Sequence, residues 1–379
     1  MIYLDNAATT LKKPFFVYPS ILKETVRNSA NAGRGGHLYS IRAANGIYET
    51  QESLCRLFNI STPEQIAFTP NATYALNLGI LGMLDENSHA IITQMEHNSV
   101  LRPVHNTCKY TILKADRHGN IKLSDIKNAI RRNTKMIICT HASNVCGTIM
   151  PIDKIAKIAH ENGLYFMVDA AQTAGCQTID VEKSKIDLLA FSGHKGLMTP
   201  MGVGGLYVKE GVPIKPIITG GTGSFSKSPE QPDFMPDMLQ SGTLNAPAII
   251  SAKKSIDFII KETPVAIDEK ETSLALKLVE NLLNINGVTV YGMNDKKSRN
   301  GTVAFNIRNL DSVYVSEILN DEYHICVRGG LHCAYPAHVA LGSEKTGAIR
   351  ASFGYFNKSA DVNKLTQAVS KIAKNPILS

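Results

Sequence analysis

Short apolar runs alternate with amphipathic stretches from about residue 65 to residue 210. The runs are rich in β-branched residues and carry few charges, which is typical of strands buried on both faces of a sheet. Between them, residues 152–162 place Ile152, Ile155 and Ala159 on one side of a helix, with Pro151 before it and Gly163 after it. The alternation predicts an α/β fold with a mostly parallel sheet between helices. The predicted strands are 66–69, 90–93, 136–140, 165–168 and 188–191.

The pattern changes in the second part of the chain. Residues 211–247 contain many glycines and prolines and show little periodicity, so we expect a long irregular loop with a functional reason to exist. Helical periodicity returns at 249–261 and 267–284, and strand patterns follow at 288–291 and 302–306. This mixture predicts a second, α+β domain. We expect a large domain over residues 15–245 and a small domain over 246–379, completed by residues 1–14.

Composition and charge exclude several classes of protein. The chain of 379 residues is 44% hydrophobic and 19% charged, as in ordinary globular proteins. Its net charge of +7 is scattered, without a basic stripe interleaved with aromatics, so we expect no nucleic-acid partner. No signal peptide and no membrane span are expected either. The 7 cysteines form no CxxC pair, which favours free thiols in the cytoplasm over disulfides or a metal site.

The first candidate for chemistry is a lysine just past an apolar strand. Ser192-Gly193-His194-Lys195 follows the predicted strand 188–191, and Asp169 directly follows the predicted strand 165–168. Both lie where parallel strands end and where ligands of such sheets bind. A pyridoxal phosphate (PLP) enzyme needs a lysine for a Schiff base and an acid for the pyridinium nitrogen. The pair therefore suggests PLP as cofactor.

Motifs along nearly the whole chain resemble the class V aminotransferase family of fold-type I PLP enzymes. Within it, the best match is the cysteine desulfurases of the branch that also contains selenocysteine lyases. The resemblance implies a large domain with a mostly parallel seven-stranded sheet and a homodimer. The matching segments are residues 4–10, Asn31 with Arg34-Gly35-Gly36-His37, 68–73, 96–99, 143–148, 168–172, 192–195, 241–245, 328–334 and 350–352.

The resemblance implies how the cofactor is held. Lys195 would form the Schiff base, and Asp169 would pair with the pyridinium nitrogen. Gln172 is similar to the residue that hydrogen-bonds the phenolic oxygen of the ring, and His97 occupies the position of an imidazole that stacks on the ring. The implied phosphate ligands are Ala72, Thr73, Ser192 and His194, with Thr243 reaching the phosphate of the neighbouring subunit.

The resemblance also implies the substrate contacts and the reaction. Arg350 would clamp the carboxylate of the substrate, with Asn144 as a second hydrogen-bond donor. Cys333 aligns with the nucleophile that takes the sulfur of cysteine as a persulfide and releases alanine. Its loop contains glycines, from which we expect mobility, and Arg and His neighbours that can stabilise a thiolate. Leu331 stands where the branch usually has a histidine.

Alternatives remain open at this stage. Taken alone, His97 is also readable as a surface histidine, Thr73 and Asp169 as helix caps, Arg350 as half of a surface ion pair, and Cys333 as a structural cysteine. The expected activity is that of a cysteine desulfurase acting on L-cysteine and passing sulfur to an acceptor protein. The alternatives are a selenocysteine lyase or cysteine-sulfinate desulfinase, a class V aminotransferase that does not use the thiol, and a scaffold without catalysis.

Overall fold

The computed structural model describes residues 1–33 and 35–374. Arg34 of the matched motif and residues 375–379 of the predicted small domain lie outside the described residues. Within the described part, none of the helices combines the length and the apolar character that crossing a membrane requires.

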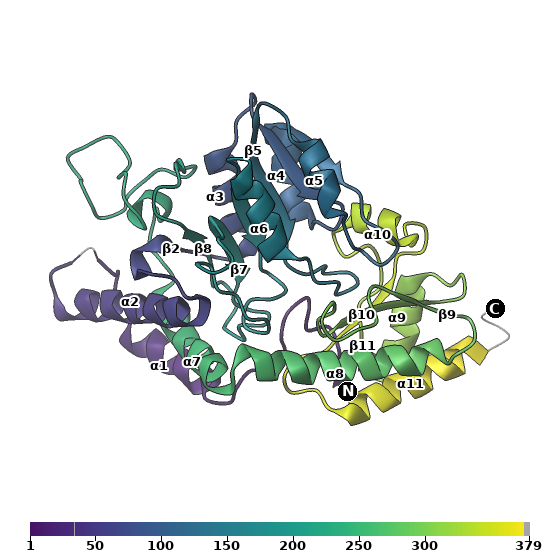
Figure 1. The fold of residues 1–379 in the computed structure, drawn as a ribbon. Helices are drawn as coiled ribbons and strands as arrows, with labels where there is room; N and C mark the ends of the chain where they lie inside the picture. The colour runs from purple at the N-terminus through teal and green to yellow at the C-terminus, as the bar shows by residue number, and fades with distance from the viewer. Residues whose placement is uncertain (34, 375–379) are drawn as a thin grey trace.

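A seven-stranded sheet occupies the middle of the molecule (Figure 1). Its strand order is β2-β8-β7-β6-β5-β3-β4, and β8 runs antiparallel to both of its neighbours while the remaining pairs are parallel. The carboxyl ends of the parallel strands therefore meet at one edge. The strands are β2 (Ile66–Thr69), β3 (His89–Thr93), β4 (Lys109–Leu113), β5 (Thr134–Thr140), β6 (Tyr165–Asp169), β7 (Leu188–Ser192) and β8 (Gly204–Val208).

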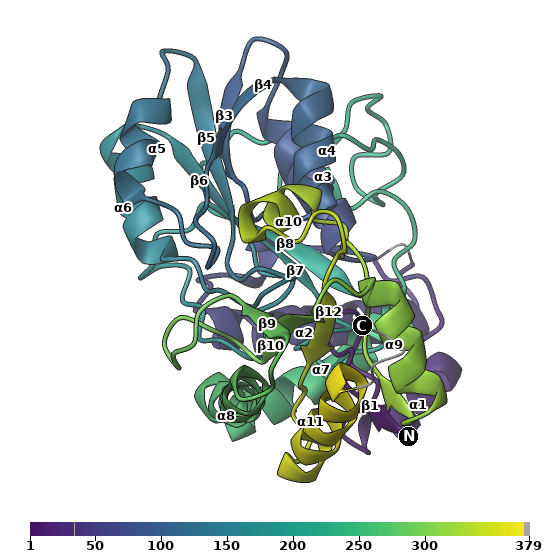
Figure 2. The same ribbon diagram turned by 90° about the vertical axis from the view of Figure 1, so that its right-hand side faces the viewer.

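Helices cover both faces of this sheet, as Figure 2 shows for α3 and α4 on one side and α5 and α6 on the other. Side chains of β5 alternate between the two cores: Met136 and Ile138 pack with α3 and α4, whereas Ile137 and Cys139 pack with α6, α2 and α7. Burial on both faces explains the nearly continuous apolar strands. The helices are α2 (Leu38–Phe58), α3 (Ala72–Met83), α4 (Asn98–Thr107), α5 (Leu123–Ala129), α6 (Ile152–Glu161) and α7 (Ala246–Glu262).

A second core lies under a three-stranded antiparallel sheet of order β12-β10-β9. The start of the chain joins it, because β1 pairs in parallel with β11 and Leu4 is buried among residues of α8 and α11. These two helices run side by side in Figure 1. The elements are β1 (Ile2–Tyr3), β9 (Val288–Tyr291), β10 (Thr302–Ile307), β11 (Ile325–Cys326), β12 (Ile349–Ser352), α8 (Pro264–Leu283), α9 (Ser312–Asp321), α10 (Tyr335–Leu341) and α11 (Ser359–Lys374), with α1 (Val17–Arg27) beside α7.

The predicted elements agree with the structure to within a few residues. The expected helices at 249–261 and 267–284 are α7 and α8. Between residue 211 and the start of α7 at Ala246, the described chain forms one 3₁₀ turn, Asp237–Leu239. The buried side of α7 packs into the core of the large sheet, and that of α8 mostly into the second core. The domain boundary at 245/246 stays a prediction.

A tight contact joins the large sheet to the second domain at Gly147. The loop that follows β5 pairs with the segment before β10, through Ile149 N to Ser298 O at 3.0 Å and Asn300 N to Gly147 O at 3.0 Å. Gly147 has a φ of +76°, and a Cβ there would lie 2.5 Å from the Thr302 carbonyl oxygen. Only glycine meets both conditions, so this position fixes the loop that carries Asn144.

We expect Gly147→Ala to lower the free energy of unfolding by about 3 kcal/mol, because it adds a steric overlap to an unfavourable φ. Gly163→Ala is the matched control: φ is +68° there, but no atom lies within 4 Å of the added Cβ. That change should cost about 1 kcal/mol. Urea unfolding midpoints of both variants measure the difference, and equal losses would contradict the role of the contact.

Candidate active site

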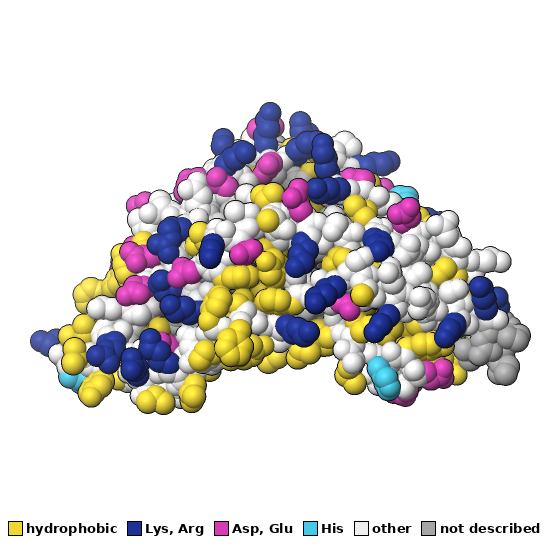
Figure 3. Space-filling model, turned by 90° about the horizontal axis from the view of Figure 1, so that it is seen from below, with side chains coloured by type: hydrophobic (Ala, Val, Ile, Leu, Met, Phe, Trp, Pro, Cys, Tyr) yellow, Lys and Arg dark blue, Asp and Glu magenta, His cyan; other side chains and the backbone are white. Residues whose placement is uncertain are grey.

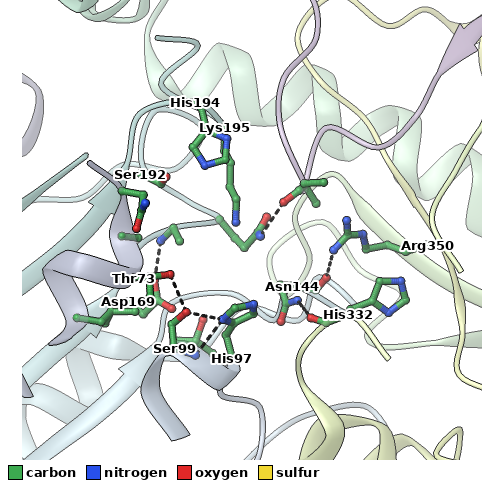
Figure 4. A pocket seen from close by; sticks show the side chains of 18 of the residues that line it. Thr73, His97, Ser99, Asn144, Asp169, Ser192, His194, Lys195, His332 and Arg350 are labelled. Atoms are coloured by element: carbon green, nitrogen blue, oxygen red, sulfur yellow. Dashed lines mark hydrogen bonds between the residues drawn. The ribbon is translucent and has the colours of Figure 1, made fainter. Parts of the chain in front are cut away.

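The predicted site residues gather around one cavity of about 270 Å³ at the carboxyl edge of the large sheet (Figure 4). Thr243 and Cys333 are the two that do not line it. The predicted residues that line it are Ala72, Thr73, His97, Asn144, Asp169, Gln172, Ser192, His194, Lys195 and Arg350. Sequence segments from the start, the middle and the end of the chain thus form one site.

Lys195 and Asp169 are placed by neighbouring strands. Asp169 is the last residue of β6 and Lys195 lies three residues beyond β7, and these strands are paired in parallel. Burial raises the pKa of the Asp169 carboxyl, while the Ala171 N–H and the charge of Lys195 oppose the rise. Burial also lowers the pKa of the Lys195 amine to about 8, opposed by Asp169. Such a pair of displaced pKa values is typical of functional sites.

His97 and Thr73 are connected at the starts of two helices. The Nδ1 atom of His97 accepts a hydrogen bond from Ser99 N at 3.1 Å, and the hydroxyl of Ser99 lies 2.9 Å from Thr73 Oγ1. Burial, followed by the charge of Lys195, lowers the pKa of His97 to about 4. His97 is therefore a neutral imidazole at neutral pH, a form that suits stacking on an aromatic ring.

Several polar groups around the cavity are suited to an anion. Ala72 and Thr73 form the first turn of α3, where backbone N–H groups lack intrahelical acceptors. Ser192 Oγ and His194 Nδ1 are buried and have no hydrogen-bond partner among the described residues. A buried polar atom without a partner is costly, so these atoms point to a missing ligand with several acceptors, such as a phosphate. Together with Asp169 and Lys195, the residues present fit PLP.

Arg350 is buried rather than part of a surface ion pair, the alternative that the sequence left open. It is 1% exposed, pairs with Asp5 at 2.6 Å and donates from Nη1 to the Asn144 carbonyl at 3.0 Å. Its Nε is buried without a partner among the described residues. The Asn144 side chain donates to the His332 carbonyl at 2.8 Å, as Figure 4 shows.

Cys333 is exposed and lies outside the cavity lining, although the preceding residue, His332, lines it. Leu331, where the resemblance would place a histidine, is also exposed and does not line the cavity. The backbone of this loop is hydrogen-bonded at several points, and its expected mobility stays a prediction. The Cys333 carbonyl accepts from Asn98 N at 2.7 Å, and Gly330 N donates to Ser312 Oγ at 3.0 Å.

Thr243 is separate from this site. It is exposed and lines another cavity, together with residues such as Thr69, Pro70 and Tyr74. The structure of one chain therefore does not bring Thr243 to the other predicted phosphate ligands.

Two charged residues of the site, Arg328 and Glu96, were not among the predicted cofactor or substrate ligands, although the arginine was expected to stabilise a Cys333 thiolate. Arg328 lines the cavity and pairs through its backbone with Arg350, which places two guanidinium groups at one side. Glu96 is buried behind the site, accepts from Thr93 Oγ1 at 2.6 Å and Thr140 N at 2.9 Å, and has its pKa raised to about 8, mainly by burial. Both lie in matched motifs, but nothing in those motifs distinguishes them from surface charges. No group of acids, cysteines or histidines suited to a metal ion occurs among residues 1–33 and 35–374.

Comparisons with known proteins agree with the geometry. A protein of Methanothermobacter thermautotrophicus named probable cysteine desulfurase is 33% identical over 98% of this chain and 94% of its own length. The solved structure of a cysteine desulfurase from Thermococcus onnurineus superposes with a TM-score of 0.90 at 32% identity, covering 98% of this chain and 94% of the other. The cysteine desulfurase CsdA of Escherichia coli gives a TM-score of 0.86 at 25% identity, covering 100% and 95%.

These likenesses confirm the predicted fold-type I class, with its seven-stranded, mostly parallel large sheet. The family profile described as Aminotransferase class-V matches residues 2–365. The match over nearly the whole chain, together with relatives of the same length, shows that this chain belongs to the class V aminotransferase family.

Proposed function

We propose that this chain is a PLP-dependent cysteine desulfurase, which converts L-cysteine to L-alanine and takes the sulfur onto Cys333 as a persulfide. One observation carries the proposal: a single cavity collects Lys195, Asp169 and Arg350, and the residue next to Cys333 lines it. The full-length relatives named cysteine desulfurase or probable cysteine desulfurase support it.

The residues proposed to hold PLP divide into two groups. Lys195 would bind its aldehyde carbon, Asp169 its pyridinium nitrogen and Gln172 its phenolic oxygen, with His97 against the ring. The phosphate would lie at the first turn of α3, where Ala72, Thr73, Ser192 and His194 converge. When bound, PLP supplies an electron sink for the bond to the α-carbon of the substrate.

The substrate and the protons are handled by the chain itself. Arg350 would bind the substrate carboxylate, with the Asn144 side chain beside the guanidinium group. The Nε of Arg350 has no partner among the described residues, and the bond from Nη1 to the Asn144 carbonyl fixes the plane of the group. Both features favour a planar ligand with two oxygens. Because the Lys195 amine has a pKa near 8, a useful fraction is neutral at neutral pH and able to accept the α-proton.

Cys333 would perform the sulfur transfer from the mouth of the cavity. Its thiolate attacks the sulfur of the substrate, so an S–S bond forms as the C–S bond breaks. The electron pair of the broken bond stays with carbon, which is then protonated and leaves as alanine. The exposure of Cys333 also makes the persulfide accessible to a second thiol, and we propose a sulfur-acceptor protein as its partner.

A homodimer would complete the site. In α1, two polar side chains, Ser20 and Glu24, are buried against the rest of the chain. Two apolar side chains of the same helix, Leu22 and Val26, are 69% and 77% exposed. Figure 3 shows hydrophobic side chains gathered on the face below α1 and α7. An apolar helix side that faces outward favours another protein surface. Because Thr243 is exposed and does not line the cavity of its own chain, we propose that it reaches the phosphate site of a second copy.

The state of the cysteines suits a reducing compartment. All seven cysteines are free. A thiol nucleophile also needs a reducing environment to stay active. We propose the cytoplasm as the location of the protein.

The first test concerns the thiol. Cys333→Ser should abolish persulfide formation and lower alanine release from L-cysteine by at least about 100-fold, because the hydroxyl is a far weaker nucleophile. Mass analysis after incubation with L-cysteine detects the persulfide, and Cys326→Ser is the matched control at another partly exposed thiol. Undiminished sulfur release by the Cys333 variant contradicts the proposal. Thiol-independent turnover of selenocysteine or cysteine sulfinate, or a keto acid product, would favour the alternative activities.

The second test uses the pKa of Lys195. Burial lowers this pKa to about 8, so the neutral, nucleophilic amine becomes dominant as pH rises through about 8. We expect the rate at which added PLP binds the PLP-free protein to rise with a midpoint near pH 8. Visible absorbance measures it, and Lys195→Ala is the control without the amine. A midpoint near the pKa of an ordinary lysine, about 10.4, would contradict the prediction that burial lowers the pKa of Lys195.

The third test concerns the dimer. The double variant Leu22→Glu with Val26→Glu should raise the dimer dissociation constant by at least about tenfold, because charges replace apolar contact area. Sedimentation measures it, and Leu283→Glu is the control, an apolar side chain 56% exposed at the end of α8. A chain that is monomeric when unmodified, or a dimer unaffected by the double variant, contradicts this interface.

A further inference from the structure

Two histidines lie buried behind the Cys333 turn. His332 is 3% exposed and His338 is 0% exposed, and their rings are nearly parallel, with 5.5 Å between centroids and 14° between the planes. His338 belongs to α10 and is not among the residues that line the cavity. Nothing in the proposed reaction uses His338, although it is a buried titratable side chain near the nucleophile.

The hydrogen bonds of the pair determine where the protons are. His332 Nε2 lies 3.2 Å from the Arg328 carbonyl oxygen, which only accepts, so this nitrogen carries the hydrogen. His332 Nδ1 is then an acceptor, and His338 Nε2, 3.3 Å away, must donate to it. His338 Nδ1 accepts in turn from the hydroxyl of Ser343 at 2.8 Å. With both rings neutral, this arrangement satisfies these three contacts, and His338 also bonds to the Leu331 backbone.

The same contacts exclude the pair from acid–base chemistry. Both ring nitrogens of each histidine are already engaged within the protein, and none is left to face a substrate. Burial, together with the charges of Arg350 and Arg328, lowers the pKa of His332 to about 2. Burial also lowers the pKa of His338 to about 4, although the Leu331 backbone and Glu344 oppose this shift. The pair therefore stays neutral at the pH of the cell.

The turn that the pair supports is a strained one. His332 and Cys333 have φ values of +50° and +55°, two consecutive side-chain-bearing residues in the left-handed region. Such a backbone persists only where the surroundings hold it in place. Asn144 and Asn98 bind the carbonyls of His332 and Cys333 on one side, and the His338 ring holds the His332 ring on the other.

We propose that His338 is a positioning residue: through the ring of His332 it fixes the strained turn that presents the Cys333 thiol at the mouth of the cavity. The link to sulfur transfer rests on the proposed function, but the fixing of the turn does not. His338 acts without touching substrate or cofactor. The role is a mechanical one, with both histidines neutral.

The test compares substitutions that remove or restore the donor. His338→Leu removes the N–H that His332 Nδ1 needs, whereas His338→Gln offers an amide N–H at a similar reach. His89→Leu is the matched control: His89 is also 0% exposed, and its ring lies 2.8 Å from Thr134 Oγ1 and 2.9 Å from Thr111 Oγ1 at the start of β3. Ser343→Ala serves as a milder second variant if His338→Leu does not fold.

Amide hydrogen exchange of the peptide 329–334 reports on the turn directly, without any enzymatic activity. His338→Leu should accelerate it at least about tenfold, His338→Gln should restore most of the protection, and His89→Leu should leave it unchanged. With Ser343→Ala the same peptide should exchange a few times faster, because the hydrogen bond from the Ser343 hydroxyl to His338 Nδ1 is lost. Unchanged exchange in His338→Leu, or in Ser343→Ala where the former is not folded, overturns the proposal.

Kinetics then separate positioning from proton transfer. In His338→Leu we expect kcat for alanine formation to fall about tenfold or more with KM nearly unchanged, since the substrate contacts are intact. The pH profile of kcat between 6 and 8 should keep its shape in His338→Gln. A limb of that profile that disappears in His338→Gln would assign proton transfer to His338 and overturn the positioning role. If Cys333→Ser retains activity while the exchange results hold, the proposed function fails and the positioning of the turn stands.

Discussion

The parallel pairing of β5, β6 and β7 is the constraint on which the site depends. Thr140 at the end of β5 is in register with Asp169, and Asp169 with Ala190 of β7. This register brings the residues that follow each strand to one edge of the sheet. Parallel strands must return through crossover connections, such as α6 between β5 and β6, and this places their carboxyl ends together.

Burial at this edge then sets the protonation states. Desolvation disfavours the charged form of each group, so it lowers the pKa of Lys195 and His97 and raises that of Asp169. The result is an amine that is easily neutral and an imidazole that is neutral, beside a carboxyl group in need of a cation. Ser192 Oγ and His194 Nδ1 are also buried at this edge, and no described residue forms a hydrogen bond with them. The cavity is therefore polar, and its own side chains do not complete its hydrogen bonds.

Segments outside the large sheet supply the residues proposed to bind and react with the substrate. Arg350 comes from β12, and its partner Asp5 comes from the start of the chain. Asn144, from the loop after β5, binds the backbone before Cys333, so the turn with the thiol is attached to the large sheet as well. The contact at Gly147 fixes the same loop from the other side. The placement of Arg350 and of the Cys333 turn thus depends on contacts with one loop, the loop that follows β5.

The sequence by itself determined five of the seven strands of the large sheet and the identity of ten residues around the cavity. Apolar runs such as 136–140 are unambiguous, because a strand buried on both faces tolerates no charge. Strand β8, with two glycines in five residues, and β4, with its exposed lysine, lack that signature and were not predicted. The site motifs are local stretches, so their order along the chain was enough to recognise the family.

Only the tertiary structure decided what the side chains face. It placed Thr243 away from the cavity, Cys333 at its outside and Arg350 deep in the interior, and it showed the His332–His338 contact. These outcomes depend on packing between segments hundreds of residues apart and on burial, which sets the free energy of each charge. Sequence patterns describe which faces of an element are apolar, but they do not specify which distant groups share a cavity.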